Sequence, residues 1–128
     1  MKTIITFGTF DTLHIGHINI LNRAKSYGDK LIVGVSSDML NFIKKNIFPI
    51  FCENDRLEII ENLKAVDEVF LEESLEQKRE YILNYKADIL VMGDDWKGKF
   101  DKFNHLCEVK YLSRTPQISS TNIKSFIK

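Results

Sequence analysis

The sequence predicts a doubly wound α/β fold, with one five-stranded parallel sheet and helices packed on both of its faces. Short apolar runs of strand length alternate with segments that carry apolar residues at helical spacing. The first two runs, 4–7 and 31–35, are separated by one helical segment, which is the pattern of a βαβ unit. The length of 128 residues fits a single domain over 1–128. Ligands of such a fold are expected beyond the carboxyl ends of its strands.

The strands are expected where β-branched and aromatic residues form short continuous runs. Glycines cut off two of these runs, Gly8 after the first and Gly93 after the fourth. In chain order the expected strands are 4–7, 31–35, 68–71, 89–92 and 108–112.

The helices are expected where apolar residues recur on one face between a capping residue and a stop signal. Gly28 ends the first helix, Ser36 or Ser37 caps the second, and Ser74 opens a capping box with Gln77. Ser119 or Ser120 would cap a helix at the C-terminus. Before this C-terminal helix, the expected helices span 17–27, 38–45, 53–65 and 74 to about 85. The segment 46–51, which contains Pro49, is expected to be a loop.

The charge balance argues against a polyanion binder. Lys and Arg together number 18, and Asp and Glu number 18, so the formal net charge is zero. Nucleic-acid and membrane-surface binders usually carry a strong positive excess, and therefore neither partner is expected. No apolar stretch is long enough to span a bilayer, and no signal peptide is visible. Cys52 and Cys107 form neither a metal-ligand pattern nor a disulfide framework, so a reducing, cytoplasmic compartment is expected.

The most informative stretch, GTFDTLHIGH over 8–17, follows the first strand directly. His14 and His17 are three residues apart at the start of a helix, so they share one face. A helix N-terminus adds free N–H groups and a partial positive charge. The residues therefore predict a phosphate-binding device. The duller interpretations are a pair of surface histidines or half of a metal site, and no Cys or carboxylate stands at ligand spacing.

The GTFDTLHIGH stretch resembles the GTFDxxHxGH signature of the nucleotidylyltransferase superfamily, in its cytidylyltransferase branch. The segment RTPQISST over 114–121 is similar to the family's RTxGISTT motif, and MGDDWKGKFD over 92–101 resembles a stretch of the glycerol-3-phosphate subgroup. The resemblance spans nearly the whole chain. It implies a Rossmann-like nucleotidylyltransferase fold and a homodimer.

The resemblance implies transfer of CMP from CTP to glycerol 3-phosphate, with release of pyrophosphate. The product, CDP-glycerol, would feed a cell-envelope polymer such as teichoic acid or capsule. Mg²⁺ is expected, held mainly by the nucleotide phosphates. A phosphate monoester is already ionised near neutral pH, so no general base is needed and positioning plus electrostatics should suffice.

Site residues carried over by motif fall into three groups. The implied catalytic residues are His14, His17, Lys44 and Arg114. The implied CTP-binding residues are these four with Gly8, Thr9, Phe10, Gly93, Asp94, Thr115, Ser119, Ser120 and Thr121. The implied acceptor-binding residues are Asp11, Asp38, Arg56 and Lys64.

Several of these residues have a plainer alternative. Lys44 could be a solvated helix-end lysine, and Arg56 could pair on the surface with Asp55 or Glu53. The residues Ser119 to Thr121 also suit helix capping, and 94–96 could be a mere turn. The apolar loop around 48–51 could be a contact, a lid or ordinary core. The acidic side chains of Glu53, Glu58, Glu72, Glu73 and Glu80 are expected on helix and loop surfaces.

The acceptor has alternatives as well. Lys64, Leu75 and Gln117 differ from the glycerol-3-phosphate pattern. They leave open another phosphorylated alcohol as acceptor, such as phosphoethanolamine, phosphocholine or a sugar phosphate. A nucleotide-binding module without catalysis is a further alternative. Against it stands the presence of both histidines, the lysine and the Arg-Thr…Ser-Ser-Thr tail.

Overall fold

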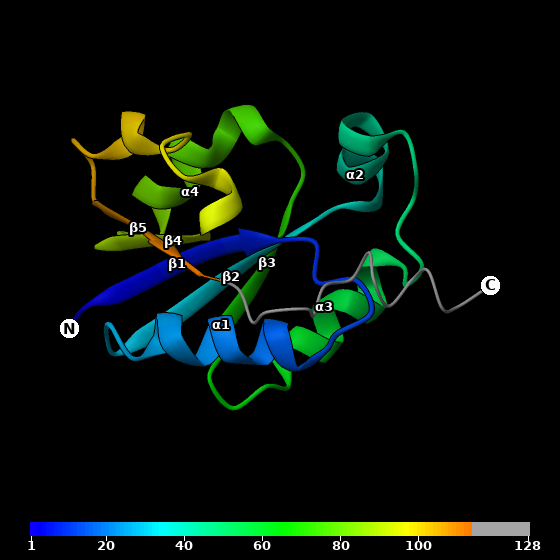
Figure 1. Cartoon of the computed structure of the whole chain (residues 1–128), viewed down its shortest axis with the longest axis horizontal. Helices are drawn as coiled ribbons and strands as arrows, with labels where there is room; N and C mark the ends of the chain where they lie inside the picture. Colours follow the sequence, from blue (N-terminus) through cyan, green and yellow to red (C-terminus); the bar gives the residue numbers. More distant parts are fainter. Residues whose placement is uncertain (114–128) are drawn as a thin grey trace.

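A computed structural model of the chain describes residues 1–113 and contains one five-stranded, all-parallel sheet (Figure 1). The strand order β3-β2-β1-β4-β5 places β1 at the centre of the sheet. The strands are β1 Thr3–Gly8, β2 Lys30–Ser36, β3 Glu68–Glu72, β4 Ile89–Gly93 and β5 Glu108–Leu112. The predicted α/β class, the number of strands and their parallel arrangement are confirmed.

Helices cover both faces of the sheet (Figure 1). One face packs on α1 and α3, through Leu21 and Ile60, and the other packs on α4 and the segment before β5, through Ile82 and Phe103. The helices are α1 Ile15–Lys25, α2 Asp38–Lys45, α3 Glu53–Glu61 and α4 Lys78–Asn84, with single 3₁₀ turns at Leu75–Gln77, Asp94–Trp96 and Asp101–Phe103. None of the helices within 1–113 is long and apolar enough to cross a membrane.

The core explains why the central strands are apolar along their whole length. Along β1, Ile4 packs into one core cluster and Ile5 into the other, and the same alternation is seen in β2 and β4. A parallel sheet that is covered on both faces needs apolar residues at successive positions. The continuous apolar runs of the sequence therefore indicate a sheet that is covered on both faces.

Helix boundaries differ from the expectations in three helices. Helix α1 begins at Ile15, because His14 caps it, and ends at Lys25, so both of its ends lie two residues earlier than expected. Helix α3 ends at Glu61, and the residues up to Val66 form single turns instead of continuing the helix. Ser74 accepts a hydrogen bond from the N–H of Glu76, and the turn that follows is 3₁₀ before α4 begins. The expected C-terminal helix lies outside the described residues.

Candidate active site

The histidine pair forms the start of α1, immediately beyond the carboxyl end of β1. Nδ1 of His14 accepts a hydrogen bond of 3.0 Å from the N–H of Gly16. Nδ1 of His17 accepts one of 3.3 Å from the N–H of His14, which closes a reciprocal capping box. The two rings stack with their centroids 3.9 Å apart and an angle of 21° between their planes. The helix cap therefore fixes both imidazoles in one orientation.

This arrangement determines where the imidazole proton lies. Because each Nδ1 accepts a hydrogen bond, the proton of each neutral ring lies on Nε2. Nε2 of His14 is buried and has no hydrogen-bond partner among residues 1–113. Burial also lowers the pKa of His14, which favours the neutral ring. A buried donor without an acceptor is rare in proteins, so Nε2–H of His14 is a candidate donor for an anionic ligand.

The loop between β1 and α1 holds an unusual backbone conformation. Phe10 and Thr12 adopt positive φ angles of 53° and 49°, a region in which bulky and β-branched residues are strained. The Phe10 ring contacts His17 edge to face, with centroids 5.5 Å apart. A Cβ atom at Gly8 would lie 2.7 Å from this ring. Gly8 is therefore required by the close approach of Phe10.

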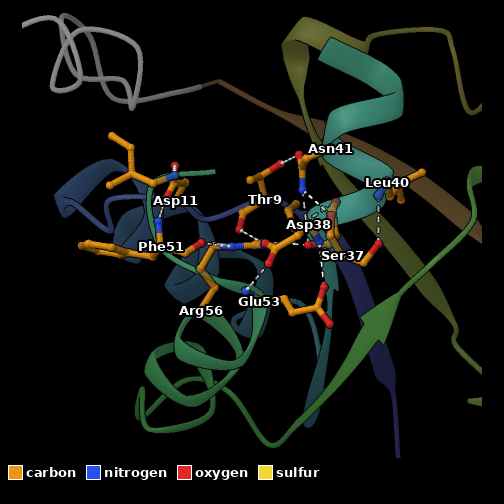
Figure 2. A network of polar contacts seen from close by, with 12 residues as sticks. Thr9, Asp11, Ser37, Asp38, Leu40, Asn41, Phe51, Glu53 and Arg56 are labelled. Atoms are coloured by element: carbon orange, nitrogen blue, oxygen red, sulfur yellow. Dashed lines mark hydrogen bonds and ion pairs between the residues drawn. The ribbon is translucent and has the colours of Figure 1, made fainter. Parts of the chain in front are cut away.

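Arg56 is the centre of a polar network at the carboxyl ends of β1 and β2 (Figure 2). Its side chain is fully buried, at 0% exposure. Nη1 donates to the carbonyls of Thr9 and Ser36 at 2.9 and 2.7 Å, and Nε donates to that of Phe51 at 2.9 Å. Nη2 donates to Asp38 at 2.7 Å. The alternative of a surface pair with Asp55 or Glu53 is thus wrong, because Arg56 lies in the interior.

Asp38 and Glu53 connect the N-termini of α2 and α3. The N–H of Asp38 donates to Oε1 of Glu53 at 2.8 Å, and the N–H of Glu53 donates to Oδ2 of Asp38 at 3.2 Å. Each carboxylate therefore caps the other helix, where the macrodipole favours a negative charge. The Asp38 carboxylate also pairs with Arg56, so both of its oxygens bind groups of α3.

Asp11 anchors the loop that joins α2 to α3. Its carboxylate is buried and accepts hydrogen bonds from the N–H groups of Ile50, at 2.7 Å, and Phe51, at 2.9 Å (Figure 2). The apolar residues of this loop are exposed, which excludes the alternative that they belong to the core; they are Ile47, Phe48, Ile50 and Phe51. The loop is thus an exposed apolar surface held at its base by one aspartate.

Thr9 and Lys44 show how α2 joins the site. The hydroxyl of Thr9 donates to Oδ1 of Asn41 at 2.7 Å, and the amide of Asn41 donates to the carbonyl of Ser37 at 2.8 Å. Lys44 lies in the last turn of α2 and is half-buried. Its ammonium has no ion pair or hydrogen bond within the described part of the chain. Burial is the largest cause of the lowered pKa of Lys44.

Most of the expected site residues that the structure describes gather at one edge of the sheet. The residues around His14 follow β1, the helix with Asp38 and Lys44 follows β2, and Gly93 ends β4, directly before Asp94. Since β1 lies between β2 and β4, these segments meet at the carboxyl ends of three neighbouring strands.

Lys64 lies apart from this edge. It is exposed on the segment between α3 and β3, where the chain approaches the amino ends of the strands. It borders a hollow of about 230 Å³, whose lining includes Ile18 and Asn22 of α1. The expected residues Arg114, Thr115, Ser119, Ser120 and Thr121 lie outside the described residues.

Three functional features were not visible in the sequence pattern. Asn41 orients the Thr9 hydroxyl. The carboxylate of Glu53 accepts from the N–H of Asp38 and so caps α2. The expectation that Glu72 is a surface acid is wrong, because it is 1% exposed and pairs with buried Lys78. No local signal identifies these roles, since each depends on contacts between separate elements.

The carboxylate oxygens of Asp11 and Asp38 are already engaged by N–H donors. Asp11 binds two backbone N–H groups, and Asp38 binds Arg56 and the N–H of Glu53. No group of three His, Cys, Asp or Glu side chains within residues 1–113 is placed to hold a metal ion. The donor set therefore fits a metal ion that arrives with the phosphates of a ligand better than one held in a protein cage.

The chain is similar to known proteins over nearly its whole length. The cytidylyltransferase-like family model matches residues 5–126. Glycerol-3-phosphate cytidylyltransferase of Bacillus subtilis strain 168 is 49% identical over 127 residues, which are 99% of this chain and 98% of that protein. The enzyme of the same name from Staphylococcus aureus is 44% identical over 124 residues, 97% of this chain and 93% of that protein.

A solved structure supports the same assignment. A lipopolysaccharide core biosynthesis protein from Thermoplasma volcanium superposes with a TM-score of 0.78 at 32% identity, covering 90% of this chain and 98% of that one. The match to the family model and the similarity to these relatives over nearly the full length lead to one conclusion. The chain belongs to the cytidylyltransferase-like family.

Proposed function

We propose that this protein is a cytidylyltransferase that transfers CMP from CTP to glycerol 3-phosphate, giving CDP-glycerol and pyrophosphate. The observation that carries the proposal is the buried Nε2–H of His14, which has no acceptor among residues 1–113 and lies at a helix N-terminus. The choice of acceptor is supported by the relatives of that name, which are 44 to 49% identical over nearly the whole chain.

The proposed reaction is an exchange of one phosphoanhydride for another. A phosphate oxygen of the acceptor forms a bond to the α-phosphorus of CTP, and the bond from the α-phosphorus to the bridging oxygen of the β-phosphate breaks. Pyrophosphate leaves with that oxygen and the electron pair. The acceptor phosphate is largely a dianion at neutral pH, so no residue has to remove a proton.

The chain's own residues supply positioning and positive potential. His14 and His17 present Nε2–H toward the phosphates, and the start of α1 adds its partial positive charge. The half-buried ammonium of Lys44 stabilises the charge that develops on the leaving pyrophosphate. For CTP we further propose Gly8, Thr9, Phe10, Gly93 and Asp94 with the motif residues Arg114, Thr115, Ser119, Ser120 and Thr121.

The proposed acceptor residues contribute in different ways. Asp11 and Asp38 use their carboxylates to fix the surrounding loop and helices, so we propose that they shape the acceptor pocket without binding the acceptor directly. Arg56 uses four of its five N–H groups internally and is fully buried, so we propose that it supports the acceptor pocket through Asp38 and the carbonyls that it binds. We propose that Lys64 contributes to acceptor binding only when a partner subunit or the bound acceptor completes the site, because Lys64 lies away from the carboxyl ends of the strands.

Mg²⁺ would be carried on the triphosphate, where it neutralises phosphate charge. We also propose a cytoplasmic homodimer whose product feeds an envelope polymer such as teichoic acid or capsule.

The test of the proposed function measures pyrophosphate release from CTP and Mg²⁺ with each of four acceptors. These are glycerol 3-phosphate, phosphoethanolamine, phosphocholine and a sugar phosphate. Glycerol 3-phosphate is expected to give the highest kcat/KM, and His14→Ala should lose most of that activity. Faster turnover of another acceptor would show that this acceptor is the substrate. Tight CTP binding without turnover of any acceptor would show that the protein is a nucleotide-binding module and not an enzyme.

A further inference from the structure

Thr9, the first residue after β1, is held by two side chains that come from later elements of the chain. Its carbonyl accepts a hydrogen bond of 2.9 Å from Nη1 of Arg56 in α3, and its hydroxyl donates one of 2.7 Å to Oδ1 of Asn41 in α2. These bonds span 47 and 32 positions of the sequence. Both side chains are buried, so Thr9 is fixed from the interior of the protein.

The backbone sets the orientation of the Asn41 amide. Nδ2 of Asn41 donates to the carbonyls of Ser36 and Ser37 at 3.3 and 2.8 Å, in the turn that begins α2. Both N–H groups of the amide are thereby used, and Oδ1 faces Thr9 as an acceptor. Asn41 therefore determines where the Thr9 hydroxyl points.

The chain immediately after Thr9 is strained and has to be held. Phe10 and Thr12 have positive φ angles of 53° and 49°. Strain of this kind persists only where surrounding contacts fix the chain. The cap of α1 fixes the far end of this segment at His14, and the two bonds to Thr9 fix its near end. Between these ends the Phe10 ring lies edge to face against His17, with centroids 5.5 Å apart.

The bond between Thr9 and Asn41 also connects this segment to α2. Asn41 and Lys44 are three residues apart in α2, so they lie on the same side of the helix. The bond therefore fixes the helix that carries Lys44 relative to the loop that leads to His14.

We propose that Asn41 is a positioning residue for cytidylyl transfer. Through the Thr9 hydroxyl it keeps the strained segment 10–12, and with it His14 and His17, in the conformation that meets the phosphates. This inference rests on the proposed function of the two histidines. Asn41 itself does not touch the substrate, because both ends of its buried amide bind the protein.

The first variant, Asn41→Leu, removes the acceptor and keeps the size of the side chain. It should fold, because the carbonyls that lose the amide retain other partners. The carbonyl of Ser36 still accepts from Nη1 of Arg56, and that of Ser37 still accepts from the backbone N–H of residue 41.

The second variant, Thr9→Val, removes the same bond from its other end and keeps the shape of the side chain. Thr9→Ser restores the hydroxyl and is the conservative rescue. The matched control is Thr6→Val, because the buried hydroxyl of Thr6 donates to the carbonyl of Val91 within the sheet. It removes a threonine hydrogen bond of the same kind without touching the loop.

Turnover should fall through kcat, with little change in either KM, because the imidazoles act on the transition state. We expect kcat to fall about ten- to hundredfold in Asn41→Leu and in Thr9→Val, the usual consequence of misplacing a catalytic group by about 1 Å. Thr9→Ser should recover most of kcat. Thr6→Val should lose unfolding free energy and keep kcat. A kcat near that of wild type in Asn41→Leu overturns the inference.

The double variant Thr9→Val/Asn41→Leu separates positioning from a direct contact of Thr9 with CTP. If the bond between the two side chains matters, its loss counts once, and the double variant should be about as slow as either single variant. Losses that add would show that the two residues act separately, which overturns the inference.

The ring of His17 gives a second measurement that does not depend on turnover. The chain has three histidines, whose Cε1–H signals in NMR are assigned by replacing each in turn. The His17 signal should shift in Asn41→Leu, because the Phe10 ring beside it moves, and should stay in place in Thr6→Val. An unmoved His17 signal in Asn41→Leu overturns the inference. Wild-type protein that releases no pyrophosphate overturns the proposed function, whereas this shift would still support the control of the loop by Asn41.

Discussion

At the scale of single residues, the histidine pair combines a structural role with the proposed chemical one. Nδ1 of each ring accepts a backbone N–H and completes the cap of α1, and we propose that Nε2–H of His14 donates to the phosphates of the ligand. The cap fixes the tautomer, so the donor is set before any substrate arrives. Preorganised donors of this kind stabilise developing charge without reorganising during the reaction.

Replacing His14 should separate these two roles. His14→Asn keeps a good N-cap residue and loses the buried donor, whereas His14→Ala loses both. We expect kcat to fall about 10²–10³-fold in both variants, the usual loss for one preorganised donor. Only His14→Ala should also lose about 0.5–2 kcal/mol of unfolding free energy.

Steady-state pyrophosphate release and urea denaturation would measure the two effects. Equal stability of the two variants would show that the His14 side chain does not act as a cap. Near-normal turnover in His14→Asn would show that Nε2 does not act on the phosphates.

At the scale of elements, the site depends on how α2 and α3 meet. The crossed caps of Asp38 and Glu53 join their N-termini, and Arg56 ties this junction to β1 and β2. The loop between the helices is fixed at its base by Asp11. These contacts form one structural unit around the predicted phosphate site.

Arg56→Lys should destabilise the protein strongly. Lysine keeps the charge but cannot reproduce four N–H bonds in a planar fork, so buried carbonyls and the Asp38 carboxylate lose their partners. We expect a loss of about 3–5 kcal/mol in chemical denaturation, the usual consequence of breaking a buried pair. The exposed Arg79→Lys on α4 is the control and should stay within about 0.5 kcal/mol. Equal stability of the two variants would contradict the buried network.

Asp11→Asn should loosen the 46–51 loop without unfolding the sheet. The amide retains one acceptor oxygen, so one of the two loop bonds is lost, at about 1.5–3 kcal/mol for a bond to a charged group. The hydrogen-exchange protection of the Ile50 and Phe51 amides should therefore fall about tenfold or more. Exposed Asp55→Asn serves as the comparison. Unchanged protection in Asp11→Asn would place the anchor of the loop elsewhere.

Local sequence signals predicted elements better than they predicted contacts between elements. Helix α2 was predicted with its observed bounds, Asp38–Lys45, because the cap Ser37 and the helical spacing agree locally. Helix α3 was predicted four residues too long, because nothing local ends it before the turns that follow Glu61. The interior position of Arg56 and the burial of Glu72 depend on partners from other elements, which periodicity does not encode.

At the scale of the whole molecule, neutrality results from an uneven placement of charge. The chain has 18 cationic and 18 acidic residues, and the acids nearest the site, Asp11, Asp38 and Glu53, bind backbone N–H groups or Arg56. Their negative charge is thereby balanced locally, beside the Lys44 ammonium and the His14 imidazole that we propose to face an anion. A neutral protein can thus carry one focused anion site.

Global stability should depend on pH through His14. Burial lowers its folded-state pKa, while in the unfolded chain it titrates at the ordinary value of about 6.5. Between these two pKa values the unfolded chain binds a proton that the folded protein does not, so unfolding free energy falls as the pH is lowered. The contribution is fully present above the unfolded pKa and is lost as the pH falls through the folded pKa.

Urea denaturation from pH about 7.5 to about 5 would measure this dependence. Wild-type protein should lose more stability over the range than His14→Asn, and exposed His105→Asn should behave like wild type. Parallel curves for wild type and His14→Asn would contradict the assignment.

The central position of β1 also has a consequence for the order of assembly. The network around Arg56 and the Glu72–Lys78 pair lie entirely within residues 8–78, whereas the bonds from Thr3 to Asp88 and from Thr6 to Val91 each span 85 positions. Contacts that close shorter loops form with less entropic opposition. The part of the sheet formed by β1, β2 and β3 should therefore fold first, and β4 and β5 should dock on it afterwards. The pairing of β4 with β1 is therefore expected to form late in folding, and a cut of the chain before β4 should give two fragments that can complement each other.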